Sequence, residues 1–251
     1  MRPPFNCADP ITRERGLSAA QNAVKRGEVV VLPTDTVYGI GADAFSPAAV
    51  RALLEAKGRG RDMPPPVLVP EVRTVDGLAS SVPFAVRELM DAFWPGALTI
   101  VCRAQPSLTW DLGDTGGTVA LRMPLHPVAL ELLQRTGPLA VSSANLSGHP
   151  AATLVAEAVE QLGSSVRVYL DGGASPKGAP STIVDASNGP LRMLRVGAIS
   201  EAELRAAVPN GWVEVDPDPE VHPEPEADPE AGAQDVDPAS ERPEQSGAAS
   251  G

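Results

Sequence analysis

The sequence predicts an α/β fold built on a twisted, mostly mixed sheet, and two observations carry that prediction. Helical and strand patterns alternate along residues 1–213. The stretch 214–251 is rich in proline and acidic residues and has few large aliphatic side chains. We therefore expect a single folded domain over 1–213, followed by a tail over 214–251.

Helices are expected where amphipathic segments lie between capping residues. Residues 46–57 are an example, because Ser46 can cap this helix and Pro47 fits its first turn. Residues 12–26 end at Gly27, where the chain can leave the helix. The other expected helices cover residues 83–93, 126–135, about 153–162 and about 200–207.

Strands are expected at the short apolar runs between these helices. In chain order the runs are GEVVVLPT, PVLVP, ALTIVCR, TVALRMP, PLAVSSA, VRVYLDGG, STIVDA and LRMLRV. Side chains of a strand alternate between its two faces. The run TVALRMP should therefore place Thr118, Ala120 and Arg122 on one face.

The net charge of -12 is concentrated in the tail. From Glu214 onward there are 12 acidic residues and one basic residue, Arg242, so the tail carries -11 and residues 1–213 carry -1. A segment of this composition cannot bury enough apolar surface to offset its chain entropy, and we predict that it is disordered. An anion-binding face on the domain must come from local clusters of Arg and Lys.

Several classes of protein are disfavoured by what the sequence lacks. Cys7 and Cys102 form no CxxC pair, as expected in a reducing cytosol, and the three histidines make a His-based zinc site a poor hypothesis. The N-terminus MRPPFNCADP does not have the apolar centre of a secretory signal. No apolar run approaches the roughly 18 residues of a membrane span. We expect a cytoplasmic protein that does not contact a membrane. A serine hydrolase is disfavoured because no GxSxG motif is present.

Four polar clusters follow strands or helix ends, where α/β proteins usually place their sites. They are PTDTVYG at 33–39, KGRGR at 57–61, TVALRMP at 118–124 and SSANLSG at 142–148. KGRGR suits a polyphosphate, although cations at a helix C-terminus also complement the helix dipole. Arg122 could hold a carboxylate or phosphate, or pair with a nearby acid. SSANLSG could cradle an anion or form an ordinary Asx turn.

Taken together, six motifs in order and spacing resemble the YrdC/Sua5 family of threonylcarbamoyl-adenylate synthases. They are PTDTVYGIGADA, LLEAKGRG, FWPGALTIV, TVALRMP, LAVSSANLSG and STIVD, and the resemblance covers roughly residues 17–200. It implies a twisted open sheet flanked by helices, with a basic concave face. The extra C-terminal domain of longer family members has no counterpart after Val213, so the chain resembles the short form.

The resemblance also implies roles for individual residues. Positions that hold L-threonine are matched by Thr36, Arg122 and Ser181, and Tyr38 lies in the same loop. Nucleotide-contacting positions are matched by Arg59, Thr118, Ser143 and Arg195. Lys57 and Asn145 belong to the KxR and SxN motifs, and we assign Lys57 and Arg59 to catalysis and Asn145 to ATP binding.

Three positions depart from the family pattern. Gly60 stands where proline is common, and Val141 replaces a residue that is often small or hydroxylated. The usual SPT after the SxN loop reads Ala151-Ala152-Thr153, which removes one hydroxyl. We expect Arg61 to compensate as an additional cation near the phosphates.

The implied reaction joins L-threonine, bicarbonate or CO2, and ATP into L-threonylcarbamoyl-adenylate and releases pyrophosphate. Mg2+ is expected with the ATP phosphates. The product would supply a tRNA threonylcarbamoyltransferase complex that forms N6-threonylcarbamoyladenosine at position 37 of ANN-decoding tRNAs. One alternative is a non-catalytic module that binds tRNA or double-stranded RNA through the same basic face. Another, a carbamoyl-transfer module of the hydrogenase-maturation type, would need zinc-finger and acylphosphatase regions that the sequence does not contain.

Overall fold

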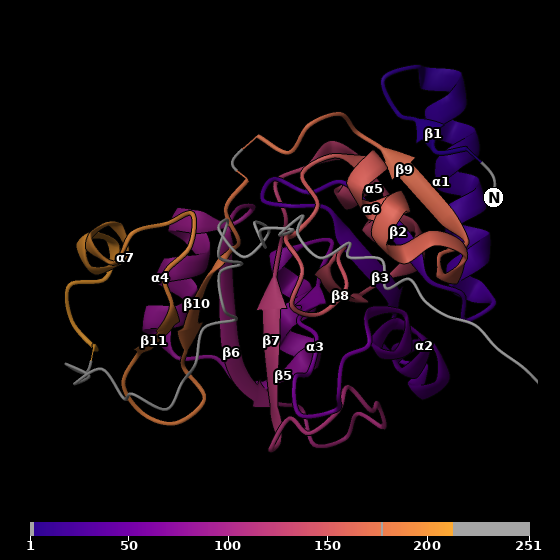
Figure 1. Cartoon of the computed structure of the whole chain (residues 1–251). Helices are drawn as coiled ribbons and strands as arrows, with labels where there is room; N and C mark the ends of the chain where they lie inside the picture. The colour runs from indigo at the N-terminus through magenta and orange to yellow at the C-terminus, as the bar shows by residue number, and fades with distance from the viewer. Residues whose placement is uncertain (1–2, 177, 213–251) are drawn as a thin grey trace, which may run out of the picture.

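The computed structural model describes residues 3–176 and 178–212, and in them eleven strands form a mixed sheet with helices around it (Figure 1). The strands are β1 (Phe5–Asn6), β2 (Val30–Leu32), β3 (Gly39–Asp43), β4 (Val67–Leu68), β5 (Ala79–Ser81), β6 (Leu98–Ala104), β7 (Thr118–Arg122), β8 (Leu139–Ser143), β9 (Val168–Asp171), β10 (Thr182–Asp185) and β11 (Arg192–Arg195). All eight expected strands are present, and β1, β3 and β5 are additional. The predicted tail lies outside the described residues.

The strand order is β1-β9-β2-β3-β8-β4-β7-β6-β10-β11, with β5 paired to β6. Parallel pairs, such as β4 with β7 and β6 with β10, occur beside antiparallel pairs, such as β3 with β8 and β6 with β7. The two ends of this order, β1 and β11, are not joined, so the sheet is open. The predicted fold class, a mixed α/β domain with a twisted open sheet flanked by helices, is confirmed.

The six expected helices all form, with small differences at their ends. The α-helices are α1 (Pro10–Lys25), α2 (Pro47–Lys57), α3 (Val75–Leu78), α4 (Phe84–Phe93), α5 (Pro127–Thr136), α6 (Val155–Leu162) and α7 (Glu201–Ala207). Short 3-10 helices cover Val72–Thr74 and Gly163–Ser165. Helix α1 begins two residues before the expected start, because the Asp9 side chain accepts a hydrogen bond from the Thr12 N–H and caps it at Pro10.

Two apolar clusters cover the two faces of the sheet. Strand β2 illustrates the division, since Val31 belongs to one cluster and Val30 and Leu32 belong to the other. The larger cluster includes side chains of α2, α4, α6 and α7. The smaller cluster is built mainly on α1 and α5. Helices therefore pack on both faces at the β2 end of the sheet.

The face covered by α1 and α5 is left open at the β6–β7–β10 end. Ile100 of β6 and Leu121 of β7 join the larger cluster, and among the described residues none from β6, β7 or β10 joins the smaller one. Alternation therefore turns Arg122 and Thr118 toward the open face, opposite to Leu121, as the sequence predicted. We call this surface, the part of that face formed by β6, β7 and β10, the open face.

Candidate functional site

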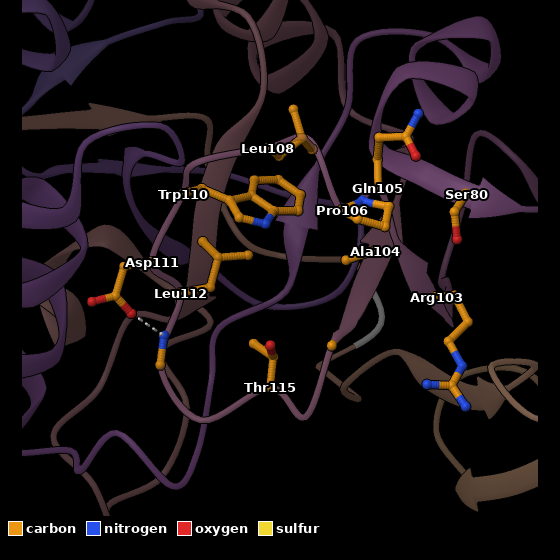
Figure 2. Close-up of a pocket in the computed structure, with 12 residues that line it drawn as sticks. Ser80, Arg103, Ala104, Gln105, Pro106, Leu108, Trp110, Asp111, Leu112 and Thr115 are labelled. Carbon is orange, nitrogen blue, oxygen red and sulfur yellow. Dashed lines mark hydrogen bonds between the residues drawn. The ribbon is translucent and has the colours of Figure 1, made fainter.

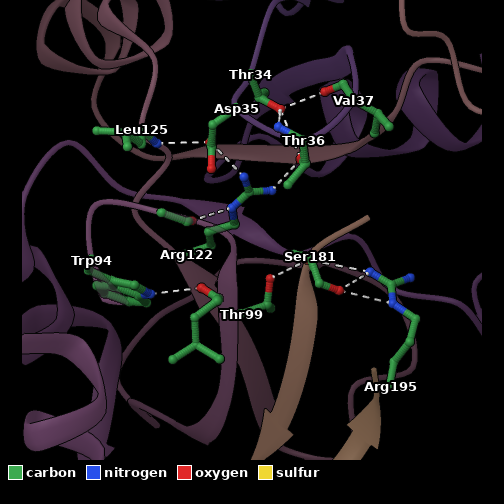
Figure 3. Close-up of polar contacts among 12 residues, drawn as sticks. Thr34, Asp35, Thr36, Val37, Trp94, Thr99, Arg122, Leu125, Ser181 and Arg195 are labelled. Atoms are coloured by element: carbon green, nitrogen blue, oxygen red, sulfur yellow. Dashed lines mark hydrogen bonds and ion pairs between the residues drawn. The ribbon is translucent and has the colours of Figure 1, made fainter. Parts of the chain in front are cut away.

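Arg122 lies at the end of β7 and is almost completely buried, at 7% exposure. Its guanidinium is held on three sides (Figure 3). Nε donates to the Gly96 carbonyl at 2.9 Å, one terminal nitrogen donates to Thr36 Oγ1 at 2.9 Å, and the other donates to Asp35 Oδ1 at 2.7 Å. The structure thus brings together Thr36 and Arg122, two of the residues predicted to hold threonine.

The loop that carries Asp35 and Thr36 is stabilised by its own polar groups. Thr34 Oγ1 donates to the Val37 carbonyl at 2.5 Å and lies 3.0 Å from Thr36 Oγ1.

Burial lowers the pKa of the Arg122 guanidinium, and the neighbouring Asp35 carboxylate acts in the opposite direction. A buried cation with a carboxylate partner and remaining donors is suited to binding an anionic group.

Ser181 and Arg195 form the second part of the site, at β10, which adjoins β6, and its neighbour β11. Ser181 Oγ lies 2.9 Å from Thr99 Oγ1, and Arg195 donates to the Ser181 carbonyl at 2.9 Å (Figure 3). The Arg195 charge is close enough to lower the pKa of Arg122. Two arginines from different strands therefore lie close enough to repel each other, and an anion bound between them would relieve that repulsion.

Lys57 is the last residue of α2, and its ammonium is directed into the SSANLSG loop. Nζ donates to the carbonyls of Ser143 and Asn145 at 2.6 and 2.7 Å, and it lies 3.3 Å from Asn145 Oδ1. Lys57 is 2% exposed. The predicted KxR and SxN motifs are therefore adjacent, and Lys57 fixes the conformation of the loop that contains Ser143 and Asn145.

Arg59 follows the left-handed cap residue Gly58 and donates to Ser142 Oγ at 2.9 Å. Arg61 behaves differently from our expectation of an additional cation near the phosphates. Its guanidinium pairs with Asp111 at 2.8 Å and with Asp114 at 3.6 Å. Arg61 thus ties its loop to residues 111–114, and these two carboxylates offset its charge.

Tyr38 does not bring its side chain to the Arg122 group. It is fully buried, and its hydroxyl donates to the Gly173 carbonyl at 2.5 Å and accepts from the Gly172 N–H at 3.1 Å. Burial raises the pKa of this phenol to about 12. The Tyr38 side chain therefore fastens the start of the segment that leads to Ser181.

Thr118 stands apart from the other candidate residues, at the opposite end of β7 from Arg122. Its hydroxyl donates to the Thr115 carbonyl at 2.8 Å. Nearby, a hollow of about 440 Å³ is lined by Arg103, Gln105, Trp110 and neighbouring residues of the 105–117 loop (Figure 2). None of the ten predicted site residues lines this hollow, so the candidate site is defined by the contacts around Arg122 and Lys57.

Comparison with known proteins identifies the family. The family model Sua5_yciO_yrdC, described as "Telomere recombination", matches residues 22–197. A protein of Mycobacterium tuberculosis (strain ATCC 25618 / H37Rv), named "Putative threonylcarbamoyl-AMP synthase", is 60% identical over 196 residues, which cover 78% of this chain and 90% of the relative. "Threonylcarbamoyl-AMP synthase" of Bacillus subtilis is 36% identical over 207 residues, 82% of this chain and 59% of the relative. The chain belongs to the Sua5/YciO/YrdC family.

Solved structures support the same conclusion. P. abyssi Sua5 complexed with L-threonine aligns with a TM-score of 0.75 and 32% identity, covering 78% of this chain and 58% of that one. A doubly substituted variant of the same protein aligns with a TM-score of 0.80 and 31% identity, covering 84% of this chain and 62% of that one. This chain therefore spans less than two thirds of the length of P. abyssi Sua5. E. coli YciO shares the fold, with a TM-score of 0.69.

Two residues of the site are not among the predicted ones. Asp35 belongs to the PTDTVYG cluster but has no predicted role, and Thr99 belongs to a predicted strand. Asp35 contacts Arg122, and Thr99 contacts Ser181. A carboxylate directly before a predicted ligand residue was an available signal for Asp35, whereas nothing in the strand pattern distinguishes Thr99.

Proposed function

We propose that the chain is a nucleotidyltransferase that makes threonylcarbamoyl-AMP from L-threonine, bicarbonate or CO2, and ATP, with release of pyrophosphate. The observation that carries the proposal is the buried Arg122, held beside Thr36 and close to Ser181 and Arg195. The names of the relatives and the threonine bound in P. abyssi Sua5 support it.

In this proposal Arg122 binds the carboxylate of threonine. A guanidinium recognises a carboxylate through two parallel hydrogen bonds, and partial burial strengthens both. The hydroxyls of Thr36 and Ser181 are assigned to the rest of the amino acid. Tyr38 contributes indirectly, by holding the segment that carries Ser181.

The nucleotide is assigned to Arg59, Thr118, Ser143, Asn145 and Arg195. The amine of threonine attacks CO2 to form a carbamate, whose oxygen then attacks the α-phosphorus of ATP while pyrophosphate leaves. Carbamate and triphosphate are both anions, and at contact distance they repel by roughly several kcal/mol in a partly desolvated site. Arg59 and Arg195 offset that repulsion, and Lys57 acts by keeping the 143–145 loop in place. Positioning and charge stabilisation account for the catalysis.

Mg2+ enters this proposal as an ion carried by the ATP phosphates, whose charge it would reduce. Over residues 3–176 and 178–212 there is no group of three His, Cys, Asp or Glu side chains that could hold a metal ion. The ion is therefore assigned to the phosphates, and every role above belongs to protein side chains.

The adenylate would be consumed in the cytoplasm by a tRNA threonylcarbamoyltransferase complex. The described part of the chain contains no helix of sufficient length and apolar character to cross a membrane. Direct contact with tRNA or double-stranded RNA would use the arginines of the open face.

The test is incubation with ATP, Mg2+, threonine and labelled bicarbonate, followed by chromatography. The expected products are pyrophosphate and an adenylate that carries the label, and omitting threonine should abolish most turnover. Lys57→Ala and Arg59→Ala should each slow turnover by about 100-fold, because the first loses the contacts that hold the 143–145 loop and the second loses a charge-stabilising group. ADP and phosphate as main products would refute the proposal. RNA binding without any nucleotide product would favour the RNA-binding alternative.

A further inference from the structure

We propose that Asp35 is a positioning residue that orients the Arg122 guanidinium for the substrate carboxylate. This inference rests on the proposed function, because it concerns the same threonine site. The residue is 6% exposed, and its carboxylate has two partners, the Arg122 guanidinium and the Leu125 N–H.

The Arg122 guanidinium has more donors than the protein uses. A guanidinium has five N–H groups. Gly96, Thr36 and Asp35 accept three of them within the described structure. Two N–H groups remain, which is the number that a carboxylate accepts in a bidentate pair. The three protein partners therefore decide which edge of the guanidinium is left for a substrate.

Asp35 connects two strands that are not neighbours in the sheet. Asp35 follows β2, whereas Arg122 ends β7, and β3, β8 and β4 lie between these two strands in the sheet. Asp35 Oδ1 accepts from Arg122 at 2.7 Å and from the Leu125 N–H at 2.9 Å. One carboxylate oxygen thus holds both the guanidinium and the backbone that follows its strand. Such a contact fixes the guanidinium relative to Thr36, the next residue after Asp35.

Asp35 also balances the charge around Arg122. Arg195 acts on Arg122 as a nearby like charge, and Asp35 is the carboxylate that offsets it. Breaking a buried pair by removing one partner leaves the other charge uncompensated and free to take another geometry. A buried ion pair is weak evidence for a purely stabilising role. The Asp35–Arg122 ion pair is better explained by a positioning role, in which Asp35 orients the Arg122 guanidinium in the site.

The experiment compares Asp35→Ala, Asp35→Asn and a control, Asp43→Asn, in the full-length protein. Asp43 also accepts a backbone N–H at its Oδ1, from Phe45 at 2.9 Å, but this contact is local and lies at the end of β3. KM values for threonine and for ATP are measured by pyrophosphate release, with thermal melting of each variant. Asp35→Ala should raise the KM for threonine by about tenfold or more, on the scale of a charged hydrogen bond. The KM for ATP should change less than about twofold.

Asp35→Asn keeps an acceptor oxygen without the charge, so its threonine KM should rise by only about threefold, the scale of a neutral hydrogen bond. Asp43→Asn should leave both KM values unchanged. Equal changes in both KM values, or a lowered melting temperature with unchanged KM values, would overturn the assignment. If Asp35→Ala does not fold, an unchanged KM for threonine in Asp35→Asn would also overturn the assignment. Failure of the proposed function is distinguishable, because the unaltered protein would then form no threonine-dependent product.

Discussion

Arg122 is a cation that the fold has removed almost entirely from water. Its cost of burial is offset by Asp35, by the Gly96 carbonyl and by the Thr36 hydroxyl. A side chain held in this way loses little further entropy when a ligand binds, so its remaining hydrogen bonds contribute more fully to affinity.

Arg122→Ala should therefore weaken threonine binding far more than ATP binding. Losing a charge-assisted pair in a buried site costs roughly 2–4 kcal/mol. Arg103→Ala is the matched control, because Arg103 lies on the same face, is exposed and contacts the Ser187 carbonyl. Calorimetry with each ligand separately measures both effects. If ATP affinity falls while threonine affinity holds, Arg122 has been assigned to the wrong substrate.

Single residues also show where the sequence-based predictions reach their limit. The family resemblance identified Thr36, Arg122 and Ser181 as candidates, and the structure gathers them at one edge of the open face. The burial of Lys57 and Tyr38 was not predictable, because both side chains donate hydrogen bonds to loops that lie far away in the sequence. Lys57 contacts residue Asn145, 88 positions later.

At the scale of one element, helix α2 delivers the KxR motif and ends at Gly58. Gly58 has φ 62°, the left-handed region, and a Cβ added to it would meet no atom within 4 Å. Gly58→Ala should lower the free energy of unfolding by about 1–2 kcal/mol, the cost of this conformation for a residue with a Cβ. Chemical denaturation measures it. Gly77→Ala, inside α3 and equally uncrowded, is the control and should be neutral or slightly stabilising.

Helix α5 begins at a histidine cap, which makes its stability depend on pH. His126 Nδ1 accepts from the Val128 N–H at 3.3 Å, a contact that requires the neutral ring. Burial lowers the pKa of His126 below its ordinary 6.5, more than nearby Asp35 raises it. The unfolded chain then binds the proton more readily than the folded protein. The contribution of the neutral His126 to stability is therefore present above pH 6.5 and is lost as the pH falls below that value.

Asparagine caps helices well but does not titrate in this range. Unaltered protein should therefore lose more unfolding free energy than His126→Asn between about pH 7 and 5.5, by less than about 1.4 kcal/mol per pH unit. Urea denaturation at both values measures the difference. Parallel losses in the two proteins would show that His126 does not titrate on unfolding.

Strand β3 was missed because its sequence, GIGAD, has few residues typical of strands. It forms because β2 and β8 flank it and pair with its backbone N–H and C=O groups. A Cβ on Gly39 would lie 2.6 Å from Val141 Cγ1, so Val141 fills the space that the glycine leaves. This explains one departure from the family pattern: Val141 belongs to the smaller apolar cluster.

At the scale of the whole molecule, the site depends on a strand order that local patterns do not specify. The patterns predicted eight strands and six helices correctly. Which strands become neighbours depends on contacts between distant parts of the chain, such as that between Thr36 and Arg122, which are 86 positions apart. The open face arises because α1 and α5 cover only part of the sheet, and this coverage is a property of tertiary packing.

All ten predicted site residues lie between Thr36 and Arg195, so the chemistry should not require the acidic tail. Deleting residues 216–251 removes most of the negative charge and none of the residues assigned to threonine or ATP. Threonine- and bicarbonate-dependent pyrophosphate release should stay within about threefold, less than ~0.7 kcal/mol in the barrier. Measurements at two salt concentrations would separate a long-range charge effect, which salt screens, from a direct contact. A hundredfold loss in a truncated protein that still melts cooperatively would show that the tail takes part in the reaction.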